Sequence, residues 1–422
     1  MRLGYLALPR FPVQRRVREQ PQLKGRALVL AREHQGVRWV EHASGAALAA
    51  AIRPGMTVAR ASSRLPGLLT LPYSPADEAQ AVLALGEALL TLAPGFQLDA
   101  PRGLWLDASA AALKGGERPW LQAVVEACAA LGRQGQAAVA SERFTAQVAA
   151  GRSALEVVAP GGGAAALAFT PLEALSLTGR VDAVQVGALR SLGLATLGEL
   201  AALPSGAVAA RYGAAGVEAA RLARGDDEVG FTPDALPEVI DEALAFDWPA
   251  QQLEPVLFGL KTVVDRLASR LQGRGQAAVR LTAWLVLEQG TGPVELPLRL
   301  ARPSAQGKLL LELLRHQLGD LVVRSPVTGL RLRVDEACAD EARQLRLDEA
   351  PAGEAALEVV LSRLSSALGP QALQAAELQA QLRADGAFRL KPFSPPRPGH
   401  APAQAGADPV HLARPARLLR AP

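Results

Sequence analysis

Short apolar segments alternate with amphipathic helical segments along the first 160 residues, and this alternation constrains the fold more than any other feature. Leu3–Leu8 has the length and composition of a strand, and Ala76–Leu92 has apolar residues along one side of a helix. Pro119–Leu131 predicts a further helix and Ala137–Ala140 a further strand. The alternation predicts an α+β domain built on a sheet.

The stretch Gln97–Ser109 lies between two of these helices and predicts a strand, an abrupt turn and a second strand. Carboxylates at the ends of strands often hold metal ions. Asp99 and Asp107 are the acids of this stretch, whereas Arg102 and Gly103 have no side-chain oxygen. Whether the stretch is a metal site depends on the rest of the chain.

Residues 171–225 predict short helices with short connections. Within them, one helix breaks at Gly193 and Thr196 caps the next, as in a helix-hairpin-helix. Such a turn can offer backbone N–H groups to a phosphate without reading sequence. We therefore predict contacts with DNA from Leu192, Gly193, Leu194 and Thr196. A plain helical hairpin has the same pattern.

An acidic, proline-containing linker over 226–238 precedes a second α/β unit, with helices over 253–271 and 306–318 and strands over 277–288, 294–300 and 327–334. A chain of 422 residues is long enough for two to four domains.

The apolar runs of the sequence, such as Ala46–Ile52, are too short to span a bilayer, so no membrane association is expected. The N-terminus lacks the features of a secretory signal. Two lone cysteines suit a reducing cytoplasm.

Known catalytic and metal-binding motifs are missing from the sequence. The five histidines have no metal-ligand spacing with one another or with cysteine. Gly273-Arg-Gly275-Gln-Ala-Ala278 matches a nucleotide fingerprint by letters, but it follows a helix and precedes a strand, the reverse of the required order. No residue is identified as a nucleophile or a general base.

Positive charge is concentrated near the two ends of the sequence. Residues 1–38 have nine Lys/Arg against two Glu, a net charge of +7, and the tail from Gly386 has six Lys/Arg against one Asp, a net charge of +5. Basic ends on a chain of net charge +4 favour a polyanion partner. Ordinary solvated arginines would give the same count.

Taken in order, these segments resemble the Y-family (UmuC-type) DNA polymerases. Gly55–Pro72 is similar to that family's fingers segment, Val139–Ala150 to a palm segment and Leu189–Leu203 to the hairpin of the thumb. The resemblance implies a polymerase-like right hand of class α+β, with a palm sheet, small fingers, a helical thumb, an α/β little finger and a disordered C-terminal tail. The implied domains are a palm-like domain at 1–10 and 75–165, a fingers-like domain at 11–74, a thumb-like domain at 166–228, a little-finger-like domain at 240–340, a partner-binding region at 341–390 and a basic tail at 391–422.

Active members of that family hold two metal ions with palm carboxylates. The resemblance aligns those carboxylates with Ala7 and Pro9, at the end of the first predicted strand, and with Arg102 and Gly103, in the stretch Gln97–Ser109. An arginine repels Mg²⁺, and none of the four offers a carboxylate. We therefore expect no cofactor, no Mg²⁺ at the palm and no polymerase activity.

This loss is similar to that of the catalytically silent, ImuB-like branch of the family. The resemblance implies an adaptor in DNA damage tolerance (translesion synthesis and damage-induced mutagenesis) that binds primer-template DNA and joins a sliding clamp, a RecA-like accessory protein and an error-prone replicative-type polymerase. It implies a cytoplasmic protein, associated with the nucleoid on damage. The branch's clamp-binding peptide corresponds to Gln344, Leu345 and Leu347, with Asp348 in place of the aromatic anchor.

Two other functions remain open at this point. The chain is an active, divergent translesion DNA polymerase if its carboxylates lie elsewhere than the resemblance places them. It is a DNA-binding module without partners if only the basic surface is functional.

Overall fold

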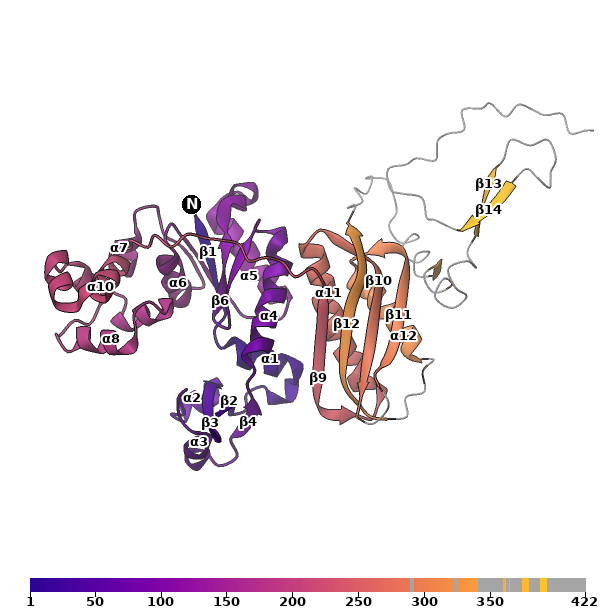
Figure 1. Cartoon of the computed structure of the whole chain (residues 1–422), viewed down its shortest axis with the longest axis horizontal. Coiled ribbons are helices and arrows are strands. Elements are labelled where there is room, and N and C mark those ends of the chain that lie inside the picture. The colour runs from indigo at the N-terminus through magenta and orange to yellow at the C-terminus, as the bar shows by residue number, and fades with distance from the viewer. Residues whose placement is uncertain are drawn as a thin grey trace, which may run out of the picture. The chain divides into compact units, whose positions relative to one another are not determined.

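The computed structural model describes residues 1–288, 292–319, 321, 325–340, 360–361, 364, 374–378 and 388–392 (Figure 1). The chain divides into two compact units. The first comprises Met1–Leu244 and Glu254–Gly275, and the second comprises Ala245–Leu253 and the chain from Gln276 onward. Among the described helices, none is both long and apolar enough to cross a membrane.

The first unit is built on a five-stranded sheet with the order β5-β6-β1-β7-β8. The central strand β1 is antiparallel to both of its neighbours, β6 and β7, whereas β7 and β8 are parallel. The strands are β1 (Leu3–Ala7), β5 (Phe96–Asp99), β6 (Gly103–Asp107), β7 (Gln136–Ala140) and β8 (Leu155–Val157).

Helices cover both faces of this sheet because the central strands are apolar on both sides. Leu6 belongs to a core with residues of α4 (Pro75–Ala88) and α5 (Glu117–Ala130). Its neighbour Tyr5 points to the opposite face, as successive strand residues do, and belongs to a core with α6 (Arg143–Arg152). The predicted α+β class is confirmed.

A small three-stranded sheet, with the order β3-β2-β4, comes after β1 in sequence. Its elements are β2 (Leu28–His34), β3 (Val37–Ala43), β4 (Leu69–Pro72), α2 (Gly45–Ala49) and α3 (Val58–Arg64). Ser44 and Thr57 cap the two helices with their hydroxyl groups, each of which accepts from a backbone N–H of the first turn.

One helix of this region was not expected from the sequence. Helix α1 (Phe11–Glu19) begins a few residues after β1. Pro9 and Pro12 follow the predicted strand and stop it, but Pro12 also lies in the first turn of α1, where a proline needs no N–H partner. The strand prediction is therefore confirmed, and the helix beside it was missed.

The next part of the first unit is helical and has its own core, which includes Leu172, Leu189, Leu197 and Leu222 (Figure 1). It comprises α7 (Gly163–Leu167), α8 (Ala183–Arg190), α9 (Leu197–Ala201) and α10 (Ser205–Ala223). Helix α11 (Leu253–Gly273), which the sequence placed in the little-finger-like range 240–340, belongs mostly to the first unit.

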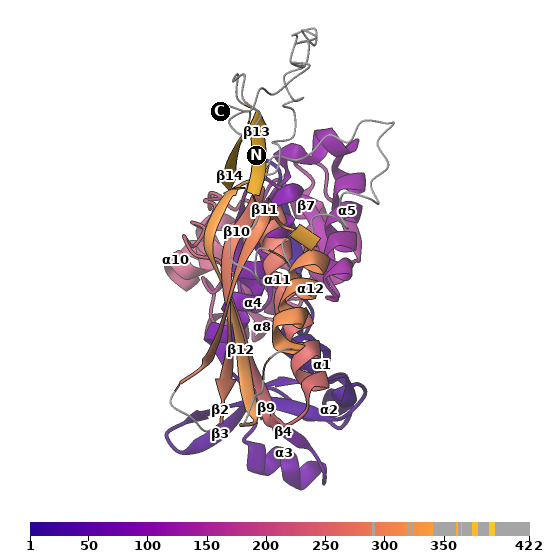
Figure 2. The same ribbon diagram turned by 90° about the vertical axis from the view of Figure 1, so that its right-hand side faces the viewer.

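The second unit contains a four-stranded sheet with the order β11-β10-β12-β9. Its strands are β9 (Asp241–Ala250), β10 (Gln276–Leu287), β11 (Val294–Ser304) and β12 (Val327–Ala339). Figure 2 shows α12 (Gly307–Gly319) lying along this sheet, and five leucines of α12 are buried. Strand β9 was not predicted, although the other three strands and α12 were.

A two-stranded ribbon of β13 (Gln374–Leu378) and β14 (Phe388–Pro392) completes the described elements. Strand β14 extends two residues into the range predicted as tail, and 393–422 lie outside the described residues. Gln344, Leu345 and Leu347 also lie outside them. The domain boundaries expected from the resemblance stay predictions.

Candidate nucleic-acid interface

The end of β1 is where the resemblance places the metal-binding carboxylates. Ala7 and Gly103 are cross-strand partners, and the Leu8 N–H donates to the Arg102 carbonyl oxygen at 2.7 Å. Pro9 comes directly after Leu8, and its carbonyl accepts from the Gln14 side chain. The fold therefore brings together the four positions that the sequence related only through the resemblance, and none of them has a carboxylate.

Asp99 is the cross-strand partner of Gly103, and both of its carboxylate oxygens accept hydrogen bonds. The Arg102 guanidinium donates to one oxygen at 2.5 Å, while the Tyr5 hydroxyl and the Gln147 amide donate to the other at 2.6 and 2.8 Å. Arg102 also donates to the Leu177 carbonyl at 2.7 Å. Burial, and then the Asp99 charge, raise the pKa of Tyr5. A buried carboxylate held by three donors is a structural acceptor.

Gly103 leaves no room for a side chain. A Cβ at this position would lie 2.2 Å from the Leu6 carbonyl oxygen and 2.9 Å from the Tyr5 hydroxyl. Asp107, at the far end of the same strand, caps a short 3₁₀ helix by accepting from the Ser109 N–H at 2.8 Å. In the part of the chain that the structure describes, no group of three His, Cys, Asp or Glu could hold a metal ion. These residues do not fit Mg²⁺, which requires several oxygen ligands.

The helical hairpin has the local structure that the sequence predicts. Helix α8 ends at Arg190, Gly193 adopts a φ of 85°, and Thr196 caps α9. However, the Glu199 carboxylate accepts from the N–H groups of Ala195 and Thr196, at 2.6 and 3.1 Å. These two hydrogen bonds lower the pKa of Glu199.

A phosphate at this turn would therefore have to displace the Glu199 carboxylate, which carries the same sign of charge. Leu192 is exposed. DNA contact by Leu192, Gly193, Leu194 and Thr196 stays a prediction.

A basic surface lies on the sheet of the second unit, where one of its arginines, Arg333, pairs with Asp335 at 3.0 Å. Trp284 of β10 pairs in register with Arg331 of β12, and Arg280 of β10 pairs with Arg299 of β11. Alternate residues of these strands, such as Leu281 and Leu332, are buried on the other face. We call this surface the arginine face; it consists of Arg280, Trp284, Arg299, Arg331 and Arg333.

Trp284 lies at the centre of the arginine face. The guanidinium carbons of Arg331 and Arg333 lie 5.6 and 5.0 Å from its ring centre, within the range of cation–π attraction. Its indole N–H donates to Glu295 at 3.0 Å. Trp284 is half-buried, and guanidinium groups beside a partly accessible aromatic ring are suited to phosphates and stacked bases.

The sequence located positive charge elsewhere, in the tail from Gly386 and in residues 1–38. There Arg2 pairs with Glu117 at 2.6 Å, Arg15 with Glu78 at 2.6 Å and Arg32 with Glu41 at 3.1 Å. The net charge of +7 therefore overstates what this segment offers to a polyanion. The arginine face was missed, although the alternation Arg331-Leu332-Arg333 in a predicted strand was a visible signal.

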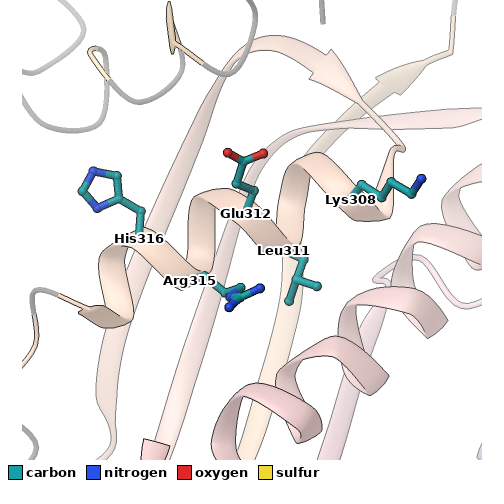
Figure 3. A pocket seen from close by; sticks show the side chains of 5 residues that line it. All are labelled: Lys308, Leu311, Glu312, Arg315 and His316. Carbon is teal, nitrogen blue, oxygen red and sulfur yellow. The ribbon is translucent and has the colours of Figure 1, made fainter. Parts of the chain in front are cut away.

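A shallow pocket lies on α12 (Figure 3). The described side chains that line it, Lys308, Leu311, Glu312, Arg315 and His316, all come from this one helix. These side chains include basic, acidic and apolar groups, so the lining does not indicate one class of ligand.

The fold and these surfaces define a multidomain α+β protein with a basic sheet face. Two curated relatives, each called Protein ImuB, come from two strains of Caulobacter vibrioides, NA1000/CB15N and ATCC 19089/CB 15. Each is 30% identical over 380 residues, which cover 87% of this chain and 79% of the relative. The chain belongs to the ImuB family.

Comparison with family models gives no match. Among solved structures, DinB from Sulfolobus solfataricus has a TM-score of 0.46 and 16% identity, and covers 79% of this chain and 98% of its own. Dbh DNA polymerase in an insertion ternary complex has a TM-score of 0.46 and 15% identity, and covers 80% of this chain and 99% of its own.

Proposed function

We propose that this chain is a non-catalytic, DNA-binding adaptor in DNA damage tolerance by translesion synthesis. The observation that carries the proposal is the end of β1, where Ala7, Pro9, Arg102 and Gly103 supply no carboxylate and Gly103 has no room for one. In an ImuB-family chain, the lack of carboxylates at the end of β1 supports the loss of metal-dependent nucleotidyl transfer. No cofactor takes part in this proposal.

The enzymatic alternative, an active and divergent translesion polymerase, is tested by primer extension with Mg²⁺ and with Mn²⁺. We expect no incorporation, because two-metal transfer requires carboxylate ligands on both ions. Asp99→Asn and Asp107→Asn serve as controls for contaminating enzyme. Incorporation by the wild type that either substitution abolishes would overturn the non-catalytic assignment.

DNA binding is assigned to the arginine face. Arginine contacts with phosphate are independent of sequence and release counterions, so the logarithm of the affinity falls linearly with the logarithm of the salt concentration. The double variant Arg331→Gln/Arg333→Gln is expected to bind primer-template DNA about tenfold more weakly at moderate salt. Its salt slope should be shallower by about 2, as for two lost phosphate contacts.

Fluorescence anisotropy over a series of salt concentrations measures both quantities. Arg152→Gln is a matched control, because Arg152 is exposed, lies outside the arginine face and already pairs with Glu156. Equal losses of affinity in the control and in the double variant would remove the arginine face from the proposal.

The partners proposed for the adaptor are a sliding clamp, a RecA-like accessory protein and an error-prone replicative-type polymerase. Their support is the family resemblance alone. Pull-down of each purified partner with the full chain tests them, and Gln344→Ala tests whether the clamp uses the peptide at Gln344, Leu345 and Leu347. A cytoplasmic protein that joins the nucleoid on damage is the location proposed with this function.

A further inference from the structure

Three arginines from separate elements of the first unit gather beside α1. Arg18 belongs to α1, Arg133 to the segment between α5 and β7, and Arg266 to α11. A Cβ on Gly132 would lie 3.1 Å from the Arg18 Nε, so this segment lies against Arg18. The Arg133 guanidinium carbon is 4.9 Å from the centre of the Phe11 ring.

Two further contacts hold these elements in place. Gln14 of α1 exchanges hydrogen bonds with the main chain of Gln134, accepting at 2.8 Å and donating at 3.2 Å. Arg266 donates to Glu19, the last residue of α1, at 3.0 Å. The arginine positions are therefore set by α1, which contacts both the segment that carries Arg133 and helix α11.

The charges of this cluster do not balance. Arg133 is only 6% exposed, its Nη1 has no hydrogen-bond partner, and neither Arg133 nor Arg18 pairs with a carboxylate among the described residues. Glu19 accepts from Arg266 but also pairs with Arg15 and Arg16. The cluster thus has more guanidinium groups than carboxylates.

This surplus is costly without an anion. Burial, and then the charges of Arg18 and Arg266, lower the pKa of Arg133 to about 9. Burial and the charge of Arg266 lower the pKa of Arg18 as well. A buried cation without a partner destabilises a fold, and a bound anion would remove that cost.

We propose that Arg18, Arg133 and Arg266 form a binding site for a phosphate monoester dianion. Guanidinium groups match the oxygens of phosphate with paired N–H donors. Two negative charges suit a cluster with more than one surplus cation. Glu19 and Asp265 also lie near Arg18, and their negative charges offset part of the surplus.

The test measures the melting temperature of the full chain with inorganic phosphate and with chloride at matched ionic strength. A ligand that binds only the folded state raises the melting temperature. We expect phosphate to raise it by about 2–4 °C in the wild type and in Arg60→Gln, a control on the exposed side of α3. In Arg18→Gln and Arg133→Met the shift should vanish.

Arg133→Met also tests the buried charge. In phosphate-free buffer this variant is expected to melt no lower than the wild type, since an apolar side chain replaces an unpaired cation. Arg18→Gln, at a more exposed position, keeps the test valid if Arg133→Met does not fold. An equal phosphate shift in the wild type and Arg18→Gln, or no shift in the wild type, would overturn the site.

The source of the phosphate is distinguished by calorimetric titration. A nucleoside monophosphate that binds at least tenfold more tightly to the wild type than to Arg18→Gln indicates a nucleotide site. A 5′-phosphorylated oligonucleotide that gains affinity over its 5′-hydroxyl counterpart, with the gain lost in Arg18→Gln, indicates a DNA end. Binding of an acidic peptide with no effect of either phosphate would contradict the proposal.

Discussion

Glu87→Gln is expected to lower the free energy of unfolding of the first unit by about 3–5 kcal/mol. Glu87 of α4 is fully buried and accepts from Arg270 at 2.7 Å and from Arg274 at 2.9 Å. Glu242 pairs with Arg270 at 2.7 Å, so it compensates only one of the two arginines. Removing the Glu87 charge would leave the buried Arg274 side chain without a carboxylate partner among the residues that the structure describes.

Denaturant unfolding followed by circular dichroism measures this loss. Glu173→Gln is the matched control, because Glu173 pairs with Arg190 where both side chains are more than half exposed. Exposed pairs contribute less than about 1 kcal/mol. If Glu87→Gln cost no more than the control, the buried network would not be what fastens α11 to α4.

Gly103→Ala is expected to destabilise the first unit by about 3 kcal/mol, near the upper end for a group forced into a packed interior. The new Cβ would lie 2.2 Å from the Leu6 carbonyl oxygen, so the β1–β6 pair would have to separate. Gly103→Glu should cost at least as much and should gain no primer extension, since the added carboxylate could not reach its place without distorting the strands.

Gly187→Ala is the matched control. It is expected to raise the free energy of unfolding, as measured by denaturant unfolding, whereas Gly103→Ala lowers it. Nothing lies within 4 Å of a Cβ at this position in α8, and alanine favours a helix over glycine by up to about 1 kcal/mol. If Gly103→Ala unfolds at the same denaturant concentration as the wild type, the strands can adapt to a side chain at this position. The lack of space would then not exclude a carboxylate at position 103.

Both predictions concern contacts that the sequence could not supply. Glu87 and Arg270 lie in helices that the sequence predicts, but 183 residues separate them. The same holds for Arg15 and Glu78, which form an ion pair although 63 residues separate them. From the sequence, the charge of Arg15 counts as part of a basic surface, whereas the structure buries it. Local patterns contain no information about such distant partners.

Strand and helix positions were predictable where a local rule decides them. The two faces of β1 follow from its apolar residues, and the cap at Thr57 follows from its hydroxyl group. Helix α1 was missed because Pro12 stops a strand but is accepted in a first helical turn. In β9, residues such as Trp248 remain exposed, so no apolar face marked the strand.

The sequence by itself determined the α+β class, the order of most elements and the absence of carboxylates at Ala7, Pro9, Arg102 and Gly103, since these depend on residue type and local periodicity. Only the tertiary structure decided that Ala7 and Gly103 are partners, that Asp99 is occupied by three donors and that Arg133 is buried without a carboxylate among the described residues. The reason is physical: pairing, burial and close approach are set by segments distant in sequence, which become neighbours only when the core forms.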